Sequence, residues 1–389
     1  MSLNLDKSTW KRVPFGDVVR NVNETVRGAQ VAGIDRIIAM EHMDPGELRV
    51  QRWGATKDGT TFTRRVKPGQ TLFGKRRAYQ RKVAYAEFDA VCSGDIYTFE
   101  AEETALLSAL LPFLVQSNEF FDHALNTSAG SLSPRTNWRD LANFEFDLPP
   151  VDVQKSIADL LWAVERDRRA TEELQSSATA LRESVIEKRF VGDGTGTLQE
   201  LCNPAGIRIG PFGAQLHAYD YVDDGDCPVV MPQDMVEGRV STVNIQRITE
   251  ERASELAVHR LRAGDIVLPR RGELDRRALI TEAEEGWLCG TGSVRVRVRD
   301  DVSNRAVYLA LSSETVVGWL KANATGTTMP NLNAGIVARI PISLPSGEEL
   351  SRALNEIDGL DRARAAIGTR ARGLNVLRSS LLAEIFGGS

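Results

Sequence analysis

Apolar residues recur along the chain with two spacings, and each spacing predicts one kind of element. Apolar runs of strand length lie at 66–73, 90–99, 261–268 and 288–298. The last of these continues as Arg295-Val296-Arg297-Val298-Arg299, which predicts a strand with one charged face. Each half then has an apolar stretch of helical length, about 104–125 and about 307–321. Strands followed by helices in this way predict mixed α/β domains.

Two longer stretches give the clearest prediction. Residues 151–190 contain neither proline nor glycine and predict one long helix, and residues 347–389 repeat the pattern after Leu344-Pro345. A helix of about 40 residues is about 60 Å long. Apolar side chains recur in both stretches at heptad spacing, which predicts a seam along each helix.

One apolar stripe cannot bury itself, whereas two such helices can bury each other. We expect an antiparallel pair, because each helix then leads from one globular part to the other. Asp167, Arg370 and Gly368 interrupt the seam, so a modest coiled coil is predicted. The predicted seam residues are Ile157, Leu160, Val164, Leu174, Leu181, Leu360, Ile367, Leu374, Leu377 and Leu381.

The two halves of the chain also match each other in sequence. After a shift of 196 residues, 130–190 overlays 326–386 without a gap and gives thirteen identities in 61 positions. Average composition would give roughly four. The identical pairs include Pro134/Pro330, Asn137/Asn333, Arg168/Arg364 and Arg182/Arg378. A duplicated unit predicts a pseudo-two-fold molecule, which suits a partner with two half-sites.

These patterns divide the chain into four parts. The predicted ranges are a first globular domain at 1–150, a long helix at 151–190, a second globular domain at 191–346 and a second long helix at 347–389. The glycine-rich stretch 191–196 is expected to end the first long helix. No strand precedes it, so a phosphate-binding loop is disfavoured there.

Composition narrows the class of protein. Hydrophobic residues at 42% and charged residues at 26% are typical of globular proteins. The four cysteines form no C-x-x-C pair, which disfavours disulfides or zinc and fits a reducing, cytoplasmic setting. The N-terminal residues do not resemble a signal peptide, and no apolar run is long enough to span a membrane. A net charge of −5 argues against indiscriminate polyanion binding but is compatible with local basic patches.

Catalytic signatures are absent from the sequence. It contains no nucleotide-binding P-loop, no zinc-protease motif and no nucleophile elbow. The four histidines lie in unrelated contexts, where a structural or surface role is expected. We therefore expect a chain that is not an enzyme on its own and that holds no metal.

Basic residues cluster at matching positions of the two halves. Residues 64–82 carry eight basic side chains and no acidic one, with Tyr79 and Gln80 among them. The equivalent stretch of the second half carries two arginine pairs, 270–271 and 276–277, around Glu273 and Asp275. Lysine and arginine neutralise phosphates, and arginine also contacts base edges. A solvated surface loop is the alternative, but the occurrence in both halves favours a nucleic-acid face.

The loop before each long helix is a second candidate. Residues 128–138 and 324–333 are rich in serine, threonine and glycine and include arginine and asparagine side chains. Small hydroxyl residues and backbone amides suit phosphate contacts. The sequence leaves open the alternative that these residues only cap strands and build tight turns.

Together these features resemble the specificity subunit of type I restriction–modification systems. The resemblance lies in the glycine-containing loop, a Leu-Pro strand end and a long helix, found here at 130–150 and again at 326–345. The run Ile209-Gly210-Pro211-Phe212-Gly213 is similar to the opening of a target recognition domain in that family. The corresponding opening of the first half, 15–36, has no such run, and the Glu-Gln usual after Leu-Pro-Pro is Val153-Gln154. The resemblance covers nearly the whole chain.

The resemblance implies an α+β fold of two pseudo-symmetric mixed α/β target recognition domains, separated by two long antiparallel helices that form a coiled coil. Each domain would read one half of a split double-stranded DNA sequence. Half-sites on one DNA face lie about 34 Å apart, a distance that helices of about 60 Å can hold. The base sequence of the target and its spacer length do not follow from these patterns.

The resemblance also implies partners. Two methyltransferase subunits would bind pseudo-symmetrically, joined in the full complex by two motor–nuclease subunits. S-adenosylmethionine, ATP and magnesium would belong to those subunits, and this chain would bind no cofactor. The predicted DNA contacts are Lys75, Arg76, Arg77, Arg81, Lys82, Arg135, Asn137, Arg270, Arg271, Arg276, Arg277, Thr327, Asn331 and Asn333.

Two other functions are weighed against this one. A duplicated coiled-coil scaffold would join proteins without reading DNA sequence. A self-sufficient nuclease or methyltransferase is disfavoured because nucleotide and metal motifs are missing.

Overall fold

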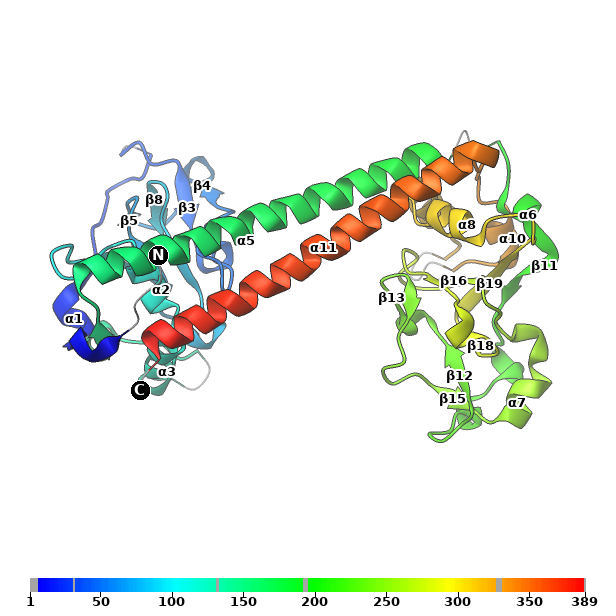
Figure 1. The fold of residues 1–389 in the computed structure, drawn as a ribbon, viewed down its shortest axis with the longest axis horizontal. Coiled ribbons are helices and arrows are strands. Elements are labelled where there is room, and N and C mark those ends of the chain that lie inside the picture. Colours follow the sequence, from blue (N-terminus) through cyan, green and yellow to red (C-terminus); the bar gives the residue numbers. More distant parts are fainter. Residues whose placement is uncertain (1–5, 31, 131–132, 192–194, 327–330, 388–389) are drawn as a thin grey trace. The chain divides into compact units, whose positions relative to one another are not determined.

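The computed structural model describes residues 6–30, 32–130, 133–191, 195–326 and 331–387. Its contacts divide the chain into two units. Unit 1 comprises Met1–Glu172 with Thr369–Ser389, and unit 2 comprises Glu173–Gly368. Each unit therefore combines one mixed α/β domain with one part of each long helix (Figure 1).

Unit 1 contains two four-stranded sheets and one two-stranded sheet. The strand orders are β2-β9-β6-β7, β4-β3-β8-β5 and β1-β10. β3 and β8 pair in parallel, and the other pairs are antiparallel. The strands are β1 (Lys11–Pro14), β2 (Val19–Val22), β3 (Arg36–Ile38), β4 (Gly54–Ala55), β5 (Arg64–Val66), β6 (Thr71–Gly74), β7 (Val83–Tyr85), β8 (Ala90–Cys92), β9 (Ile96–Ala101) and β10 (Glu145–Leu148).

Short helices cover the β2-β9-β6-β7 sheet of unit 1. They are α1 (Phe15–Val18), α2 (Leu111–Val115), α3 (Asn118–Asn126) and α4 (Trp138–Ala142). The core between them is rich in phenylalanine: the Phe73 ring lies 5.6 Å from Phe120 and 6.0 Å from Phe99, measured between ring centroids. Edge-to-face and offset contacts of this kind are favourable beyond the area they bury.

Unit 2 repeats the main sheet of unit 1 and its parallel strand pair, but its second sheet has the three strands β15-β12-β18 and its two-stranded sheet is β13-β14. The sheet order β11-β19-β16-β17 matches β2-β9-β6-β7, and β12 pairs in parallel with β18 as β3 pairs with β8. The strands are β11 (Cys202–Ile209), β12 (Cys227–Val230), β13 (Met235–Val236), β14 (Arg239–Val240), β15 (Arg247–Ile248), β16 (Ile266–Pro269), β17 (Ala278–Leu279), β18 (Leu288–Cys289) and β19 (Ser293–Val298). The helices are α6 (Leu198–Leu201), α7 (Glu250–Glu255), α8 (Asn304–Leu311), α9 (Glu314–Asn323) and α10 (Ala334–Ala338).

Several predicted elements are shorter than expected. The predicted strand 66–73 is interrupted by Gly69, whose φ of +89° turns the chain between β5 and β6. The predicted helices 104–125 and 307–321 are each two helices, because a serine caps the second helix in both units. The Ser117 side chain accepts from the Phe120 N–H, and Ser313 accepts from Val316 in the same way.

The long helices are α5 (Val151–Ile186), which ends in a π-helical turn at Glu187–Val191, and α11 (Gly347–Phe386). In unit 1 the first part of α5 contributes Ile157 and Leu161 to the core, and the last part of α11 contributes Leu382 and Ile385. In unit 2 the end of α5 and the start of α11 meet, with Val185 beside Ile357 in one core. Within each unit the two helices run antiparallel, as the pairs Arg182–Asp361 and Arg189–Glu356 show for unit 2.

The seam does not follow every predicted position. Ile157 and Val164 are buried, and Leu160, Leu360, Ile367, Leu374 and Leu381 are half-buried. Leu174, Leu181 and Leu377 are 55%, 53% and 45% exposed, so their assignment to a buried seam is wrong. A heptad seam has two sets of inward positions, and the second set lies four residues after the first. In α5 the first set includes Ile157 and Val164, and the second set is Leu161, Arg168 and Gln175. Because Arg168 and Gln175 are polar, the sequence pattern did not indicate that this side of the helix faces the seam.

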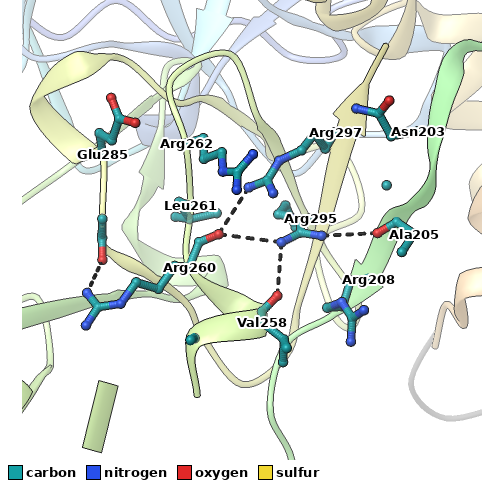
Figure 2. Close-up of a pocket in the computed structure, with 13 residues that line it drawn as sticks. Asn203, Ala205, Arg208, Val258, Arg260, Leu261, Arg262, Glu285, Arg295 and Arg297 are labelled. Atoms are coloured by element: carbon teal, nitrogen blue, oxygen red, sulfur yellow. Dashed lines mark hydrogen bonds between the residues drawn. The ribbon is translucent and has the colours of Figure 1, made fainter. Parts of the chain in front are cut away.

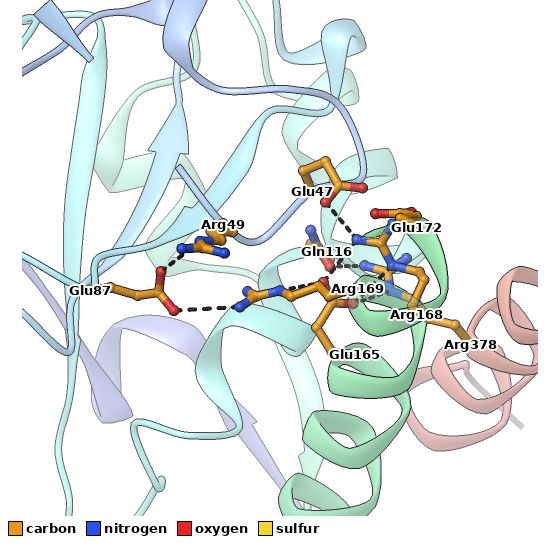
Figure 3. Close-up of polar contacts among 9 residues, drawn as sticks. All are labelled: Glu47, Arg49, Glu87, Gln116, Glu165, Arg168, Arg169, Glu172 and Arg378. Carbon is orange, nitrogen blue, oxygen red and sulfur yellow. Dashed lines mark hydrogen bonds and ion pairs between the residues drawn. The ribbon is translucent and has the colours of Figure 1, made fainter. Parts of the chain in front are cut away.

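An ionic cluster, which we call the Glu165 cluster, fills the seam of unit 1 (Figure 3). The Glu165 side chain is 1% exposed and accepts from Arg168 Nη2 at 2.9 Å, and Arg378 Nε of α11 lies 3.6 Å from its other oxygen. Arg168 also donates to Glu47 Oε2 at 2.6 Å. Burial disfavours the charge of Arg168, but its bonds to Glu47 and Glu165 outweigh this and raise its pKa. The cluster therefore ties both helices to the globular domain of unit 1.

Unit 2 has the counterpart of this cluster at positions shifted by 196 residues. Asp361 replaces Glu165, and Arg364 and Arg182 take the places of Arg168 and Arg378. Arg182 Nε lies 2.6 Å from Asp361 Oδ1, and the Asp361 side chain is 38% exposed. This pair is open to water, unlike the Glu165 cluster.

Candidate nucleic-acid interface

The predicted basic loop of unit 1 follows β6 and turns sharply before β7. It contains a 3₁₀ turn, Ala78–Gln80, flanked by Arg77 and Arg81 with φ values of +55° and +51°. A non-glycine residue in this left-handed region costs on the order of 1–3 kcal/mol. Because such strain gathers at functional sites, the conformation favours a functional role for the loop.

The loop before α4 lies against this basic loop. Thr136 donates its backbone N–H to Lys75 O at 3.0 Å, and Arg77 donates its own to Pro134 O at 2.8 Å. An isolated β-bridge joins Arg76 to Arg135. The structure therefore brings together two segments that the sequence singled out separately.

Unit 2 builds the same junction. A bridge joins Arg271 to Asn331, and Leu332 donates its backbone N–H to Arg270 O at 2.8 Å. We call these segments the interface loops: 75–82 with 128–137 in unit 1, and 270–277 with 324–333 in unit 2. In the residues that the structure describes, the interface loops of both units are joined by the same backbone pairing.

In unit 1 a carboxylate and a hydroxyl hold three interface arginines together. Asp95 lies 3.0 Å from Arg135 Nη2 and 3.5 Å from Arg76 Nη1. Arg77 Nη2 donates to Ser133 Oγ at 3.3 Å. Such exposed pairs contribute only about 0–1 kcal/mol to stability, so their consequence is the orientation of the guanidinium groups.

Three other predicted residues of unit 1 serve local contacts. Arg81 donates to Asn118 Oδ1 at 2.6 Å and lies over the Phe121 ring, while Lys82 donates to Met40 O at 2.7 Å. Lys75 lies 4.7 Å from the Tyr97 ring, and burial followed by repulsion from Arg64 lowers its pKa. These side chains shape the loop more than they project from it.

The guanidinium groups of unit 2 are held differently. Arg270 Nε donates to Asn331 Oδ1 at 3.1 Å, and its guanidinium lies 5.3 Å from the Phe212 ring. Arg271 is exposed and, within the described part of the chain, takes part in no ion pair. Arg276 pairs with Glu273. Arg271 is thus the freest cation of this loop.

Two predicted contacts have structural roles instead. Arg277 is 8% exposed and donates to the carbonyl oxygens of Leu311 and Asp275, so it is too buried to reach DNA. Asn333 caps α10 by accepting from the Ile336 N–H at 2.9 Å, which leaves only its amide nitrogen free. Asn137 is exposed at the equivalent N-cap of α4. Thr327 lies outside the described residues.

Sequence inspection missed Asp95 and Phe212 as parts of the interface. Phe212 is 55% exposed and lies in the run that resembles a recognition-domain opening, which was the one available signal. Beside Arg76 and Arg77 there is also a cavity of about 320 Å³ lined by Met40, Phe62 and Ser93 among others. Guanidinium groups at the rim of a cavity suit phosphate or base-edge contacts.

The remaining candidates for chemistry are the metal-ligating side chains and the cysteines. Among the described residues, no group of three or more histidine, cysteine or acidic side chains is arranged to hold a metal ion. All four cysteines are buried, and burial raises the pKa of Cys92, Cys202 and Cys289 to about 12. No helix in the described ranges has an apolar stretch that would cross a bilayer.

Comparison with known proteins shows what this chain resembles. Residues 56–179 match the family described as the type I restriction modification DNA specificity domain. A curated relative, the type I restriction enzyme EcoDI specificity subunit of Escherichia coli, is 28% identical over 145 residues. This match covers 36% of this chain and 32% of the relative, so it spans about a third of that protein's length.

Two solved structures have the same fold over the whole chain. One is a chain from a structure described as the basis of complex assembly and conformational transition of the type I R-M system, with a TM-score of 0.62 and 16% identity. The other is the type I restriction-modification system S subunit from M. genitalium, with a TM-score of 0.58 and 15% identity. Each match covers 100% of this chain and 99% of the other.

Residues 56–179 therefore resemble a type I DNA specificity domain, and the chain as a whole has the fold of the two solved chains. The resemblance inferred from the sequence is confirmed, as is the fold class of two mixed α/β domains linked by long helices. The division at residues 150, 190 and 346 and the assignment of individual DNA contacts stay predictions.

Proposed function

We propose that this chain is the DNA-reading subunit of a type I restriction–modification complex. Its two α/β domains would each read one half of a split DNA sequence, and the chain itself would perform no catalysis. S-adenosylmethionine, ATP and magnesium would serve partner subunits in the cytoplasm.

One observation carries this proposal. The interface loops pair in the same way in both units, through Arg76 with Arg135 and through Arg271 with Asn331. Each junction presents arginine side chains beside backbone amides, a combination that contacts phosphates and base edges. A scaffold that only joined proteins would not require a basic junction in each unit.

The assignment of each unit to one half-site can be tested with Arg271→Ala. Arg271 is exposed and unpaired, so its removal leaves the Arg270–Asn331 contact intact. The target is first identified by sequencing methylated bases in a host with and without this gene. We expect the reconstituted complex carrying Arg271→Ala to lose about 1–3 kcal/mol, about 5–150-fold in Kd, if the residue contacts a base.

The design compares two sets of duplexes, altered in one half-site or in the other. Arg271→Ala should relax discrimination only in the half-site read by unit 2, and Arg77→Ala only in the half-site read by unit 1. Arg362→Ala, on the exposed surface of α11, is the matched control and should change neither. An equal loss on every duplex would contradict base readout, and the absence of any methylated split motif would favour the scaffold function.

Docking of two methyltransferase subunits is the second part of the proposal. Leu181 of α5 and Leu377 of α11 are equivalent under the 196-residue shift, and both are about half exposed. Single exposed leucines are common on protein surfaces, so the support for docking comes from the equivalence of the two positions. Two equivalent positions suit two copies of one partner.

Native mass spectrometry tests this docking. Leu181→Lys and Leu377→Lys are each expected to remove one methyltransferase subunit, which lowers the ratio from two per specificity subunit to one. Ser176→Lys, an exposed position on another face of α5, is the control. Retention of both partners by the double variant would rule out this surface while leaving DNA reading untouched.

A further inference from the structure

Unit 2 contains a second basic surface, separate from its interface loops. A cavity of about 620 Å³ lies on β11 and β19, closed on one side by the segment 257–262 (Figure 2). Five arginines line it: Arg208, Arg260, Arg262, Arg295 and Arg297. We call it the arginine cavity.

The positive charge of the arginine cavity is only partly neutralised. Arg297 pairs with Asp265 at 2.6 Å, and Arg260 pairs with Glu250. The other three, Arg208, Arg262 and Arg295, have no carboxylate partner among the described residues. Glu285 is the one acidic residue of the lining, and its side chain lies away from Arg208 and Arg295 in Figure 2.

Arg295 is the most costly of these charges to bury, because only 5% of the residue is exposed. Its terminal nitrogens donate to the carbonyl oxygens of Val258 and Ala205, both at 3.1 Å. Its Nε is buried without a partner, and so is the Nε of Arg208. A buried guanidinium that meets only neutral acceptors is costly, since carbonyl dipoles replace water incompletely.

Neighbouring cations add to this cost. Burial lowers the pKa of Arg295, and repulsion from Arg297 lowers it further. His259, which is 5% exposed with its Nδ1 unpartnered, has its pKa lowered by burial and then by Arg208 and Arg295. Like charges held together in this way are stabilised when an anion binds between them.

Strand register separates the arginine cavity from the interface loops. Arg295 lies opposite Arg208 on one side and Val267 on the other, whereas Arg270 follows the far end of β16, beyond Pro269. In unit 1 the register of β9 places Thr98 and Glu100 where unit 2 has Arg295 and Arg297. The cavity is therefore a feature of unit 2 and not part of the duplicated interface.

We propose that the arginine cavity binds a phosphate group through Arg208, Arg262 and Arg295. Guanidinium forks approaching from different elements match an oxyanion that accepts several hydrogen bonds. The volume exceeds that of one phosphate, so the group would belong to a larger molecule or share the cavity with water. Its source is either a DNA backbone outside the half-site or a free phosphate compound.

Thermal unfolding of the full chain tests phosphate binding directly. Sodium phosphate, compared with sodium chloride at equal ionic strength, should raise the Tm of the native chain by about 2–4 °C. Arg208→Ala with Arg262→Ala should abolish this gain while leaving the Tm in chloride unchanged or higher, because two repelling charges are gone. Arg339→Ala with Arg362→Ala, two exposed arginines of the same unit, should keep the gain.

DNA binding then separates the two sources. If the phosphate belongs to DNA, the Arg208/Arg262 variant should reduce the slope of log Kd against log salt by about 2. If it belongs to a free compound, the slope stays unchanged although the Tm gain is lost. A Tm gain equal in all variants, together with an unchanged slope, would overturn the proposal. Since the Tm test needs no base readout, its result is independent of the function proposed above.

Discussion

Units 1 and 2 share the topology of their main sheet but fill it with different side chains. Phe73 and Phe99 of unit 1 occupy the strand positions of Leu268 and Val296 in unit 2. The pattern extends to the helices, where Phe120 corresponds to Val316 after the equivalent serine caps. Apolar character at given strand and helix positions therefore defines this fold, and either aromatic or aliphatic volume satisfies it.

The interface loops differ in a way that the cores do not. Asp95 holds two arginines in unit 1, and the equivalent position in unit 2 is Gly292, which leaves Arg271 unpaired. Arg77 adopts the left-handed conformation that Gly272 adopts in unit 2. Glycine satisfies this conformation at little cost, so the arginine in unit 1 points to a role for its side chain. Under the proposed function, these differences would let the two units recognise different half-sites.

The largest difference between the units is expected at the helix seam. Glu165→Ala leaves the buried Arg168 and the half-buried Arg378 without their shared carboxylate and should cost about 3–5 kcal/mol in unit 1. The equivalent Asp361→Ala removes an exposed pair and should cost about 0–1 kcal/mol in unit 2. Hydrogen–deuterium exchange in increasing urea, followed on peptides of each unit separately, measures both losses.

Glu165→Gln serves as the control for packing in that experiment, because it keeps the volume and removes the charge. It should retain part of the hydrogen bonding but not the ion pairs. Equal losses for Glu165→Ala and Asp361→Ala would mean that burial does not distinguish the two clusters.

Smaller losses of stability are expected when a core residue of one unit is replaced by its counterpart from the other unit. Phe73→Leu removes contacts to Phe99, Phe120 and Phe121 and should destabilise unit 1 by about 1–3 kcal/mol. The reverse change, Leu268→Phe, overfills an aliphatic core and should cost unit 2 about 1–3 kcal/mol. Hydrogen–deuterium exchange again measures the stability of each unit. If Leu268→Phe left the stability of unit 2 unchanged, the core of unit 2 would have room for the larger side chain.

No difference is expected at the cysteines of the two parallel strand pairs. Cys92 and Cys289 occupy equivalent positions on β8 and β18, and burial raises the pKa of each to about 12. At pH 8 their alkylation by iodoacetamide should be on the order of a thousandfold slower than that of an exposed thiol with a pKa near 9. Mass spectrometry of the native chain measures both rates, and fast labelling of one alone would mean that its unit opens locally.

The sequence predicted the long helices well because their periodicity extends over many turns. It misplaced the second line of the seam, since Arg168, Gln175 and Arg182 occupy positions where apolar residues were sought. Long arginine stems can line a seam when their charged ends meet carboxylates, and that pairing is visible only in three dimensions.

Prediction of the interface was uneven for a related reason. Basic composition located the loops after β6 and β16, and the small hydroxyl residues located the loops before α4 and α10, but only the structure joined them. Composition did not separate Arg271, which is exposed, from Arg277, which is buried six residues later. The arginine cavity was also hidden, because the sequence predicted only a charged face for β19 and did not show that the segment 257–262 lines the same cavity as Arg295 and Arg297.

The connection of α11 has a consequence for synthesis on the ribosome. Leu382 and Ile385 complete the core of unit 1, although the rest of that core is made before residue 165. Part of the apolar core of unit 1 therefore stays uncovered during translation until α11 is made, which requires more than half of the polypeptide to be synthesised after the α/β domain of unit 1. Unit 2 meets no such delay, because its own segments are contiguous in the chain.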